Sequence, residues 1–219
     1  PHSLGIFYQS MTQFLGFKSY GDEYKVMGLS AYGEPKYFNK ISKLIKKTKN
    51  GFELNLQYFL HHKKKIFNIN DNGQFIYRNL YSDKLNDLIK FERNPNDEIV
   101  QEHMDFAKSV QLIYEDTLFH ILNIAKDQNK DIYNLNLSGG CALNSVANGK
   151  IIKNTNFKNI YLNPNPGDAG GSIGSSLAFL KKNFNYNFEQ INYGYLGCSF
   201  DNKDINQVLK VNNINEKYN

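Results

Sequence analysis

The chain has 219 residues, of which 41% are hydrophobic and 14% aromatic, enough for one sizeable core. The formal net charge is +5 and comes almost entirely from Lys, with only Arg78 and Arg93 besides, so we expect a solvated Lys surface and no nucleic-acid interface. The sequence has no apolar run long enough for a transmembrane helix, and no signal-like basic and apolar segment opens it, so no membrane partner is expected. Its two cysteines, Cys141 and Cys198, fit neither a disulfide framework nor a zinc site, which predicts a cytoplasmic protein.

Helical periodicity opens the chain. Apolar residues at helical spacing over 1–20 predict an amphipathic helix that ends near Gly16. Residues 21–33, GDEYKVMGLSAYG, begin with a turn and continue as a short helical or irregular run. Glu23 and Lys25 stand there among apolar neighbours, so each is either an ion-paired surface residue or one that points into a site. Residues 36–49 are predicted to form a Lys-rich surface helix.

The period changes to two over residues 51–81, which predicts strands, and the Asn72–Gly73 step between alternating apolar residues predicts a hairpin turn. His61 and His62 are adjacent, and because such side chains diverge on a strand, we interpret them as part of a solvated loop. A long helix is predicted over about 99–127, with a wide apolar face typical of a helix packed on a sheet. No pair of histidines at a metal-binding helical spacing occurs, so His103 and His120 are predicted to be satisfied or exposed.

Two strand–loop–helix units follow in residues 134–179: NLNLSGGCALNSVANGKII and IYLNPNPGDAGGSIGSSLAFL. In each, a short apolar strand runs into glycines that open a helix, and helix N-termini bind phosphate well. Asp168, inside the second loop, suits a cation or a hydroxyl better than a bare phosphate, although a helix N-cap is the alternative. Cys141 follows two glycines, and a small buried residue is favoured over a nucleophile because no His lies close in sequence to serve as a base.

Neither glycine loop has the spacing of a P-loop or of a dinucleotide-binding fingerprint. A pair of such loops instead fits the plan of actin-like and sugar-kinase ATPases, in which two α/β lobes clamp ATP. After residue 181 the chain is rich in Asn, and we expect an irregular crossing segment followed by a short helix near 201–210.

Three segments carry a family resemblance: PHSLGIFYQSMTQFLGFKSYGDEYKVMGLSAYGEPKY, LNLSGGCALNSVANGKI and IYLNPNPGDAGGSIGSSLA. They resemble carbamoyltransferases of the nodulation and antibiotic-tailoring type, which are relatives of the tRNA threonylcarbamoyladenosine synthase and of the hydrogenase-maturation carbamoyltransferase. The resemblance runs from residue 1 to about residue 200 and is less specific in the hairpin region.

The resemblance implies an α/β fold, the second lobe of an actin-like ATPase domain. Such a lobe has a mixed sheet with helices on both faces, and the hairpin of residues 51–82 would be an insertion. Residues 1–195 would form this lobe and residues 196–219 a linker toward a following domain. Because the chain begins at Pro1 and lacks a first phosphate loop, we expect it to be a fragment without the first lobe.

The resemblance also implies an activity. Members of this family use ATP and carbamoyl phosphate to make a carbamoyl-adenylate, from which the carbamoyl group passes to a hydroxyl of a small-molecule acceptor. A divalent metal is implied, Fe²⁺ or alternatively Mg²⁺, held by a His-x-x-x-His pair and by an Asp that corresponds to Asp168. No such His pair occurs in these residues, so the fragment is expected to be inactive by itself.

The site residues implied by the resemblance have separate roles. Glu23 would accept hydrogen bonds from the ribose hydroxyls, since a carboxylate suits two hydroxyl donors. Lys25 would be catalytic, near the phosphates or the carbamoyl group. Asn144 would contact the nucleotide or the shell of the metal. The glycines that would let the backbone approach the nucleotide are Gly139, Gly140, Gly167, Gly170 and Gly171.

Two other functions stay open. The chain could be a nucleotide-binding module without chemistry, which the missing His pair favours. It could also be a kinase-like or threonylcarbamoyl-transferring relative, although an enzyme acting on tRNA should present a basic face with more Arg than this chain has.

Overall fold

The structure, a computed structural model, describes residues 1–69, 71–73, 75–187, 194–195, 197–212 and 214. The chain divides into one unit of residues 1–172 and a second of residues 173–219. The helices of the first unit are α1 (Leu4–Phe14), α2 (Glu23–Leu29), η1 (Ser30–Tyr32), α3 (Phe38–Ile41), η2 (Ser42–Leu44), η3 (Leu56–Tyr58), α4 (Asp83–Ile89), α5 (Gln101–Gln128), η4 (Gly140–Leu143), α6 (Ser145–Asn148) and α7 (Ile151–Asn154). Its strands are β1 (Ile45–Thr48), β2 (Gly51–Leu54), β3 (Phe67–Ile69), β4 (Phe75–Tyr77), β5 (Asn134–Leu137) and β6 (Asn159–Leu162).

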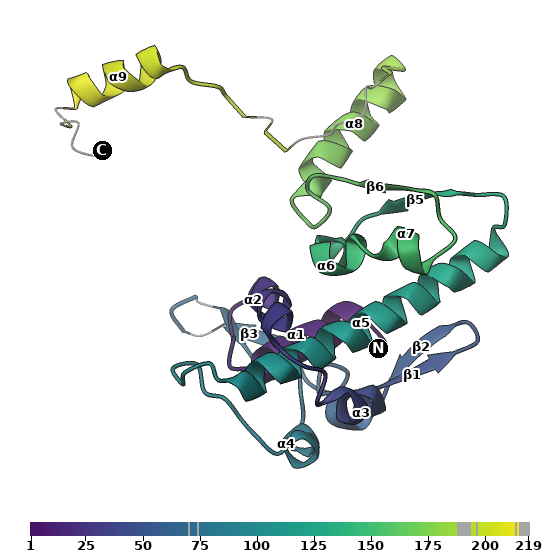
Figure 1. Cartoon of the computed structure of the whole chain (residues 1–219). Coiled ribbons are helices and arrows are strands. Elements are labelled where there is room, and N and C mark those ends of the chain that lie inside the picture. Colours follow the sequence, from purple (N-terminus) through teal and green to yellow (C-terminus); the bar gives the residue numbers. More distant parts are fainter. Residues whose placement is uncertain (70, 74, 188–193, 196, 213, 215–219) are drawn as a thin grey trace. The chain divides into compact units, whose positions relative to one another are not determined.

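Helix α5 runs through the first unit, with α1 beside it (Figure 1). The rings of Phe14 and Phe106 lie 5.3 Å apart, and Tyr8 meets Tyr114 edge-on at the same centroid distance. The core gathers apolar residues of α1 and α5 with others from α2, α4 and the first hairpin. Both helices were predicted from their periodicity and are confirmed, because a continuous apolar stripe on each is buried against the other.

The predicted Lys-rich helix of residues 36–49 is wrong. The helix α3 covers only Phe38–Ile41, and after η2 the chain becomes strand β1, which pairs antiparallel with β2. Lys49 and Asn50 form the turn between β1 and β2. The Asn50–Gly51 step is a hairpin signal, and it lies at the end of the segment that was predicted to be a helix. In the hairpin Lys46 lies opposite Glu53, a favourable cross-strand pair.

The mixed α/β composition is confirmed, but the expected single mixed sheet is not found among the described residues. They form three two-stranded sheets: β1–β2 and β3–β4 are antiparallel, and β5–β6 is parallel. The hairpin turn at Asn72–Gly73 is confirmed between β3 and β4, whereas the strand expected from residue 52 onward ends at Leu54. The β1–β2 hairpin is attached to α5 rather than to another strand: His120 Nε2 lies 2.9 and 3.1 Å from the carbonyl oxygens of Thr48 and Gly51.

The segment GLSAYGEPKY packs closely on the start of α5. A Cβ atom built on Gly33 would lie 1.9 Å from the carbonyl oxygen of Met104, so only glycine allows this approach. The Glu34 N–H donates to Asp105 Oδ1 at 2.8 Å, and Lys36 Nζ lies 2.6 Å from Asp105 Oδ2. His103, predicted to be satisfied, accepts a hydrogen bond from the Val100 N–H at 3.1 Å.

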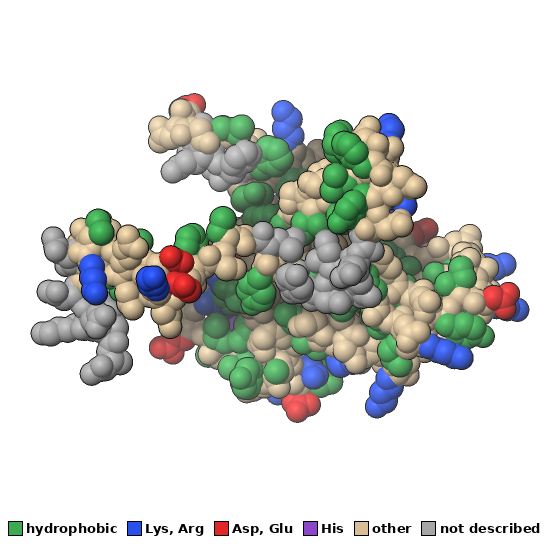
Figure 2. All heavy atoms as spheres, turned by 90° about the horizontal axis from the view of Figure 1, so that it is seen from above, with side chains coloured by type: hydrophobic (Ala, Val, Ile, Leu, Met, Phe, Trp, Pro, Cys, Tyr) green, Lys and Arg blue, Asp and Glu red, His purple; other side chains and the backbone are tan. Residues whose placement is uncertain are grey.

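Helix α8 (Gly170–Phe184) begins in the first unit and ends in the second, which also contains α9 (Asn202–Val211). The helix expected near 201–210 is therefore confirmed, and Asp201 caps it by accepting from the Asp204 N–H at 2.8 Å. Part of the expected irregular crossing segment, at 188–193, lies outside the described residues, and the predicted boundary at residue 195 stays a prediction. On the face in Figure 2, Lys and Arg side chains lie scattered rather than in one continuous patch, as expected for a solvated Lys surface.

Candidate functional site

The two glycine loops lie at the same end of the β5–β6 pair. The strands are parallel, with Leu137 opposite Leu162, so the segments that follow β5 and β6 leave the sheet at the same edge. Ligands of α/β proteins bind preferentially at the carboxyl ends of parallel strands. The sequence placed both loops after strands, and the structure brings them to a common edge.

The loops also contact each other. The Gly139 N–H donates to the Pro166 carbonyl at 2.6 Å, and a Cβ on Gly167 would lie 3.7 Å from Leu143 Cδ1. Gly139 has a φ of +93°, which L side chains rarely adopt, and the space where its Cβ would lie is open. The backbone of the first loop can therefore be approached from that side.

The second loop turns tightly before α8. The N–H groups of Gly170 and Gly171 donate to the carbonyl oxygens of Gly167 and Asp168, both at 3.0 Å. A Cβ on Gly170 would lie 2.1 Å from the Asn165 carbonyl oxygen, whereas one on Gly171 would meet nothing within 4 Å. Asp168 itself is exposed, so its carboxylate is accessible from solvent.

Asn144, predicted to contact the nucleotide or the metal shell, is buried below the first loop. Its Oδ1 accepts from the Ala147 N–H at 3.0 Å and so caps α6. The same side chain forms a pair of hydrogen bonds with Gln111 of α5, each of 3.0 Å. Asn144 therefore joins the loop to the long helix.

Glu23 and Lys25 leave α2 on different sides. Glu23 is half-buried. Burial raises the pKa of the Tyr8 phenol, and the carboxylates of Glu115 and, to a smaller extent, Glu23 raise it further. Lys25 instead pairs with Asp22, Nζ to Oδ1 2.7 Å, and lies over the ring of Phe17. The hydrogen bond to Asp22 raises the pKa of Lys25, which is the ion-paired arrangement that the sequence left open.

Cys141 lies in the first loop and is half-buried. Burial raises the pKa of its thiol, while the Tyr114 hydroxyl donates to its carbonyl oxygen at 2.9 Å. A raised thiol pKa lowers the thiolate fraction at neutral pH, which supports the interpretation of Cys141 as a packing residue rather than a nucleophile.

Several polar residues below the loop were missed from the sequence. Tyr8, Gln111 and Glu115 are all buried and form a continuous set of hydrogen bonds with Asn144 and Lys150. The available signal was polar residues on the apolar face of α5, where burial requires a partner.

The residues described here offer no cluster of three or more His, Cys, Asp or Glu side chains that could hold a metal ion. Asp168 supplies a single carboxylate at the loop, which is too few ligands for a divalent cation by itself. Within the described part of the chain the donor set does not fit a complete metal centre.

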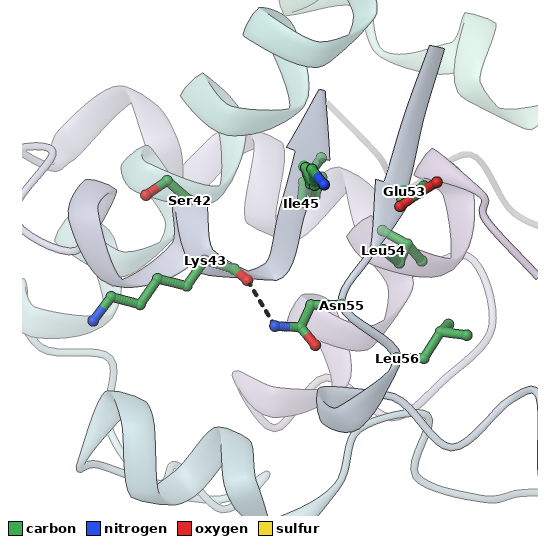
Figure 3. A pocket seen from close by; sticks show the side chains of 8 residues that line it. Ser42, Lys43, Ile45, Glu53, Leu54, Asn55 and Leu56 are labelled. Carbon is green, nitrogen blue, oxygen red and sulfur yellow. Dashed lines mark hydrogen bonds between the residues drawn. The ribbon is translucent and has the colours of Figure 1, made fainter. Parts of the chain in front are cut away.

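One pocket in the described part of the chain lies elsewhere and does not coincide with the loops. It has a volume of about 630 Å³ and is open, lined by residues of η2, β1, β2 and η3, among them Lys43, Glu53 and Asn55 (Figure 3). Asn55 Nδ2 donates across it to the Lys43 carbonyl at 3.3 Å. None of the predicted site residues lines this pocket, and its walls lack the loop geometry of a phosphate site, so we place the candidate site at the loops.

The fold and the loops define an α/β protein with a paired-loop site at the edge of a parallel strand pair. Residues 1–177 match the family described as carbamoyltransferase N-terminus, and the chain belongs to this family.

Relatives cover nearly the whole chain. An uncharacterized protein of Synechocystis is 36% identical over 96% of this chain and 33% of its own length. Nodulation protein NolNO of Sinorhizobium fredii is 29% identical over 80% of this chain and 22% of its own, and an uncharacterized protein of Methanocaldococcus jannaschii is 28% identical over 98% and 32%. The chain thus spans about a third or less of the length of these relatives. Among the described helices, none combines the length and apolarity required to cross a bilayer.

Proposed function

We propose that the chain is the nucleotide-binding lobe, of actin-like type, of a carbamoyltransferase. The whole enzyme would use ATP and carbamoyl phosphate to make a carbamoyl-adenylate, with pyrophosphate leaving from ATP and phosphate from carbamoyl phosphate. The acceptor hydroxyl oxygen would then bond to the carbamoyl carbon while AMP leaves. The observation that carries this proposal is the contact between the two glycine loops, from Gly139 to Pro166, in a chain of the carbamoyltransferase family.

The proposed roles follow from the placement of the residues. Gly139, Gly140 and Gly171 border open space, so the nucleotide can approach the backbone there. Glu23, a half-buried carboxylate in the first turn of α2, would accept hydrogen bonds from the ribose hydroxyls. Lys25 would reach the phosphates or the carbamoyl group only after leaving Asp22.

A divalent metal, Fe²⁺ or Mg²⁺, remains part of the proposal for the whole enzyme. Asp168 is its candidate ligand in this chain, but the described residues do not complete a site, so no step of the reaction is assigned to the metal here. Because of this incomplete ligand set, a nucleotide-binding module without chemistry is the second candidate for the isolated chain.

Titration calorimetry with ATP and Mg²⁺, and with Fe²⁺ under anaerobic conditions, tests the proposal. We expect Asp168→Ala to weaken binding by about tenfold or more, a loss of about 1.4 kcal/mol. Asn144→Ala should weaken it as well, because the first loop loses its attachment. Asp131→Ala is the matched control, since this Asp is also exposed but precedes β5 at the opposite end of the strand.

Gly171→Ala separates a local obstruction by the added methyl group from misfolding. A Cβ at Gly171 meets nothing within 4 Å and Ala favours a helix, so the unfolding temperature should not fall, while a nucleotide that approaches this backbone should bind more weakly. Equal affinity in all variants would place the nucleotide elsewhere, and no binding by the wild type would contradict a nucleotide-binding lobe.

A further inference from the structure

One face of α5 lies directly under the first glycine loop. Gln111, Tyr114 and Glu115 are spaced three and four residues apart, so they share this face. The Tyr114 hydroxyl donates to the Cys141 carbonyl, and Gln111 pairs with Asn144 at the end of η4. The helix therefore contacts the loop at its backbone and at its closing side chain.

The side-chain amide of Gln111 forms all four hydrogen bonds that an amide can form. Its Oε1 accepts from the Tyr8 hydroxyl at 2.8 Å and from Asn144 Nδ2 at 3.0 Å. Its Nε2 donates to Asn144 Oδ1 at 3.0 Å and to Glu115 Oε1 at 2.9 Å. With 2% of its surface exposed, Gln111 has no solvent to replace a lost partner.

Asn144 transmits this arrangement to the loop. Because its Oδ1 also accepts from the Ala147 N–H, one orientation of the side chain satisfies both the cap of α6 and the pair with Gln111. The next turn is held in the same way, since Asn148 Nδ2 donates to the Ala142 carbonyl at 2.7 Å.

The set of hydrogen bonds ends in an ion pair. Lys150 Nζ lies 2.7 and 2.8 Å from the two carboxylate oxygens of Glu115, so the buried carboxylate has a partner. Apolar residues of similar size would stabilise such a core equally well or better. A polar set centred on Gln111, whose amide is fully hydrogen-bonded, instead selects one arrangement of the groups that it joins.

We propose that Gln111 is a positioning residue, which holds the first glycine loop in the arrangement that meets the nucleotide. That Gln111 holds the loop follows from the geometry alone. That the held loop meets a nucleotide rests on the proposed function. Gln111 acts through Asn144 and does not itself touch the ligand.

Cys141 provides a natural reporter of the loop. In a Cys198→Ser background, which removes the exposed thiol, the rate of labelling by an aromatic disulfide reagent measures how often the loop opens. We expect Gln111→Met to raise this rate by about tenfold, because the loop loses both hydrogen bonds to α5 that Asn144 makes. Thr117→Val is the matched control: this buried hydroxyl of α5 bonds only to the Ile113 carbonyl in its own helix among the contacts described.

A second variant covers the case in which Gln111→Met does not fold. Exchanging the pair, Gln111→Glu with Glu115→Gln, keeps the net charge and allows a hydrogen bond between the two positions. A carboxylate at 111 cannot donate to Asn144 Oδ1, so the link to the loop is weakened. The exchange also removes the ion pair of Lys150 with Glu115, and Glu115→Gln alone is the control for that loss. This exchange should also speed labelling of Cys141, by less than Gln111→Met.

Denaturant dependence separates positioning from general stability. Labelling through local opening is insensitive to low urea, whereas labelling through global unfolding rises steeply with urea. We expect the faster labelling of the Gln111 variants to be insensitive to urea and their affinity for ATP to fall in parallel. Labelling no faster than in Thr117→Val, or faster only in step with urea, would overturn the proposal. Fast labelling with unchanged affinity for ATP would show that Gln111 holds the loop but does not affect nucleotide binding. Absence of ATP binding by the wild type would overturn both the role of Gln111 in nucleotide binding and the proposed function. In that case the labelling rates would still decide whether Gln111 positions the loop.

Discussion

The backbone of α5 restricts which amino acid can occupy a position packed against it. Gly33 is the sharpest case, because its φ of −107° is open to any residue and only the contact with the Met104 carbonyl requires glycine. The motif that suggested a functional segment from the sequence is therefore also a packing motif. The two interpretations are compatible, since α2 lies in the same segment and its Met27 Sδ accepts from the hydroxyl of Ser145, directly after the first loop, at 3.7 Å.

Gly33→Ala should destabilise the fold strongly. We expect a loss of about 2–4 kcal/mol in the free energy of unfolding, because the added methyl group must displace backbone. Gly28→Ala is the matched control: a Cβ there meets nothing within 4 Å, and the helix position should gain up to about 1 kcal/mol. Urea unfolding of both variants measures the difference, and equal stability of the two would contradict the close contact.

Lys25 and Asp168 show how geometry bears on predicted site residues. Lys25 has a carboxylate partner in Asp22 and an aromatic neighbour in Phe17, so its ammonium group is already stabilised. Asp168 is exposed in the second loop. Both assignments stay predictions, and the variants of Asp168 test the stronger of them.

Among the elements, the connection between the segment after α2 and the start of α5 depends on one carboxylate. Burial alone would raise the pKa of Asp105, but hydrogen bonds from the Glu34 N–H, Lys36 and Gln101 outweigh it and lower the pKa to about 2. The two elements are thus joined by a charged group that must stay ionised.

The stability of the fold should therefore fall in acid. A carboxyl group whose pKa is lowered on folding stabilises the folded state above its unfolded pKa of about 3.9, and this contribution is lost as the pH falls toward 2. We expect the unfolding free energy of Asp105→Asn to be lower than that of the wild type at pH 7 and to depend less on pH between 5 and 2. Chemical denaturation across this range provides the measurement; parallel pH profiles would show that Asp105 does not carry the effect.

Strand β1 is the element for which the sequence predicted the wrong secondary structure. Residues 45–48, Ile-Lys-Lys-Thr, are too few to distinguish a helical from an alternating period, and their Lys residues suit the surface of either element. Cross-strand pairing with Gly51–Leu54 decides for the strand, because it satisfies backbone groups that a frayed helix end would leave to water.

At the scale of the whole molecule, the core belongs to the first unit. All residues of the hydrophobic cluster lie between Leu4 and Ile160, and no described residue after 172 is buried. The described residues of the second unit therefore contribute no buried apolar side chain.

Removing residues 185–219 should leave the first unit intact. We expect its melting temperature to change by less than about 2 °C, since no core residue is lost. A chain that ends before residue 159 is the comparison: it lacks β6 with the partly buried Ile160 and should melt at a clearly lower temperature. A drop of more than about 5 °C on removing 185–219 would show that these residues stabilise the first unit.

The sequence by itself determined the features that depend on neighbours along the chain. The helices α1, α5 and α9, the Asn72–Gly73 turn and the two glycine loops follow from local periodicity and turn chemistry, and the quoted motifs were sufficient to identify the family.

Only the tertiary structure decided how distant residues meet. Gln111 and Asn144 are far apart in the sequence and form one buried pair, and Asp105 receives partners from residues 34 and 36. In the described part of the chain, two-stranded sheets stand where a mixed sheet with an inserted hairpin was expected. The physical reason is that a buried polar group is stable only with a partner, and a linear pattern does not specify which distant group will satisfy it.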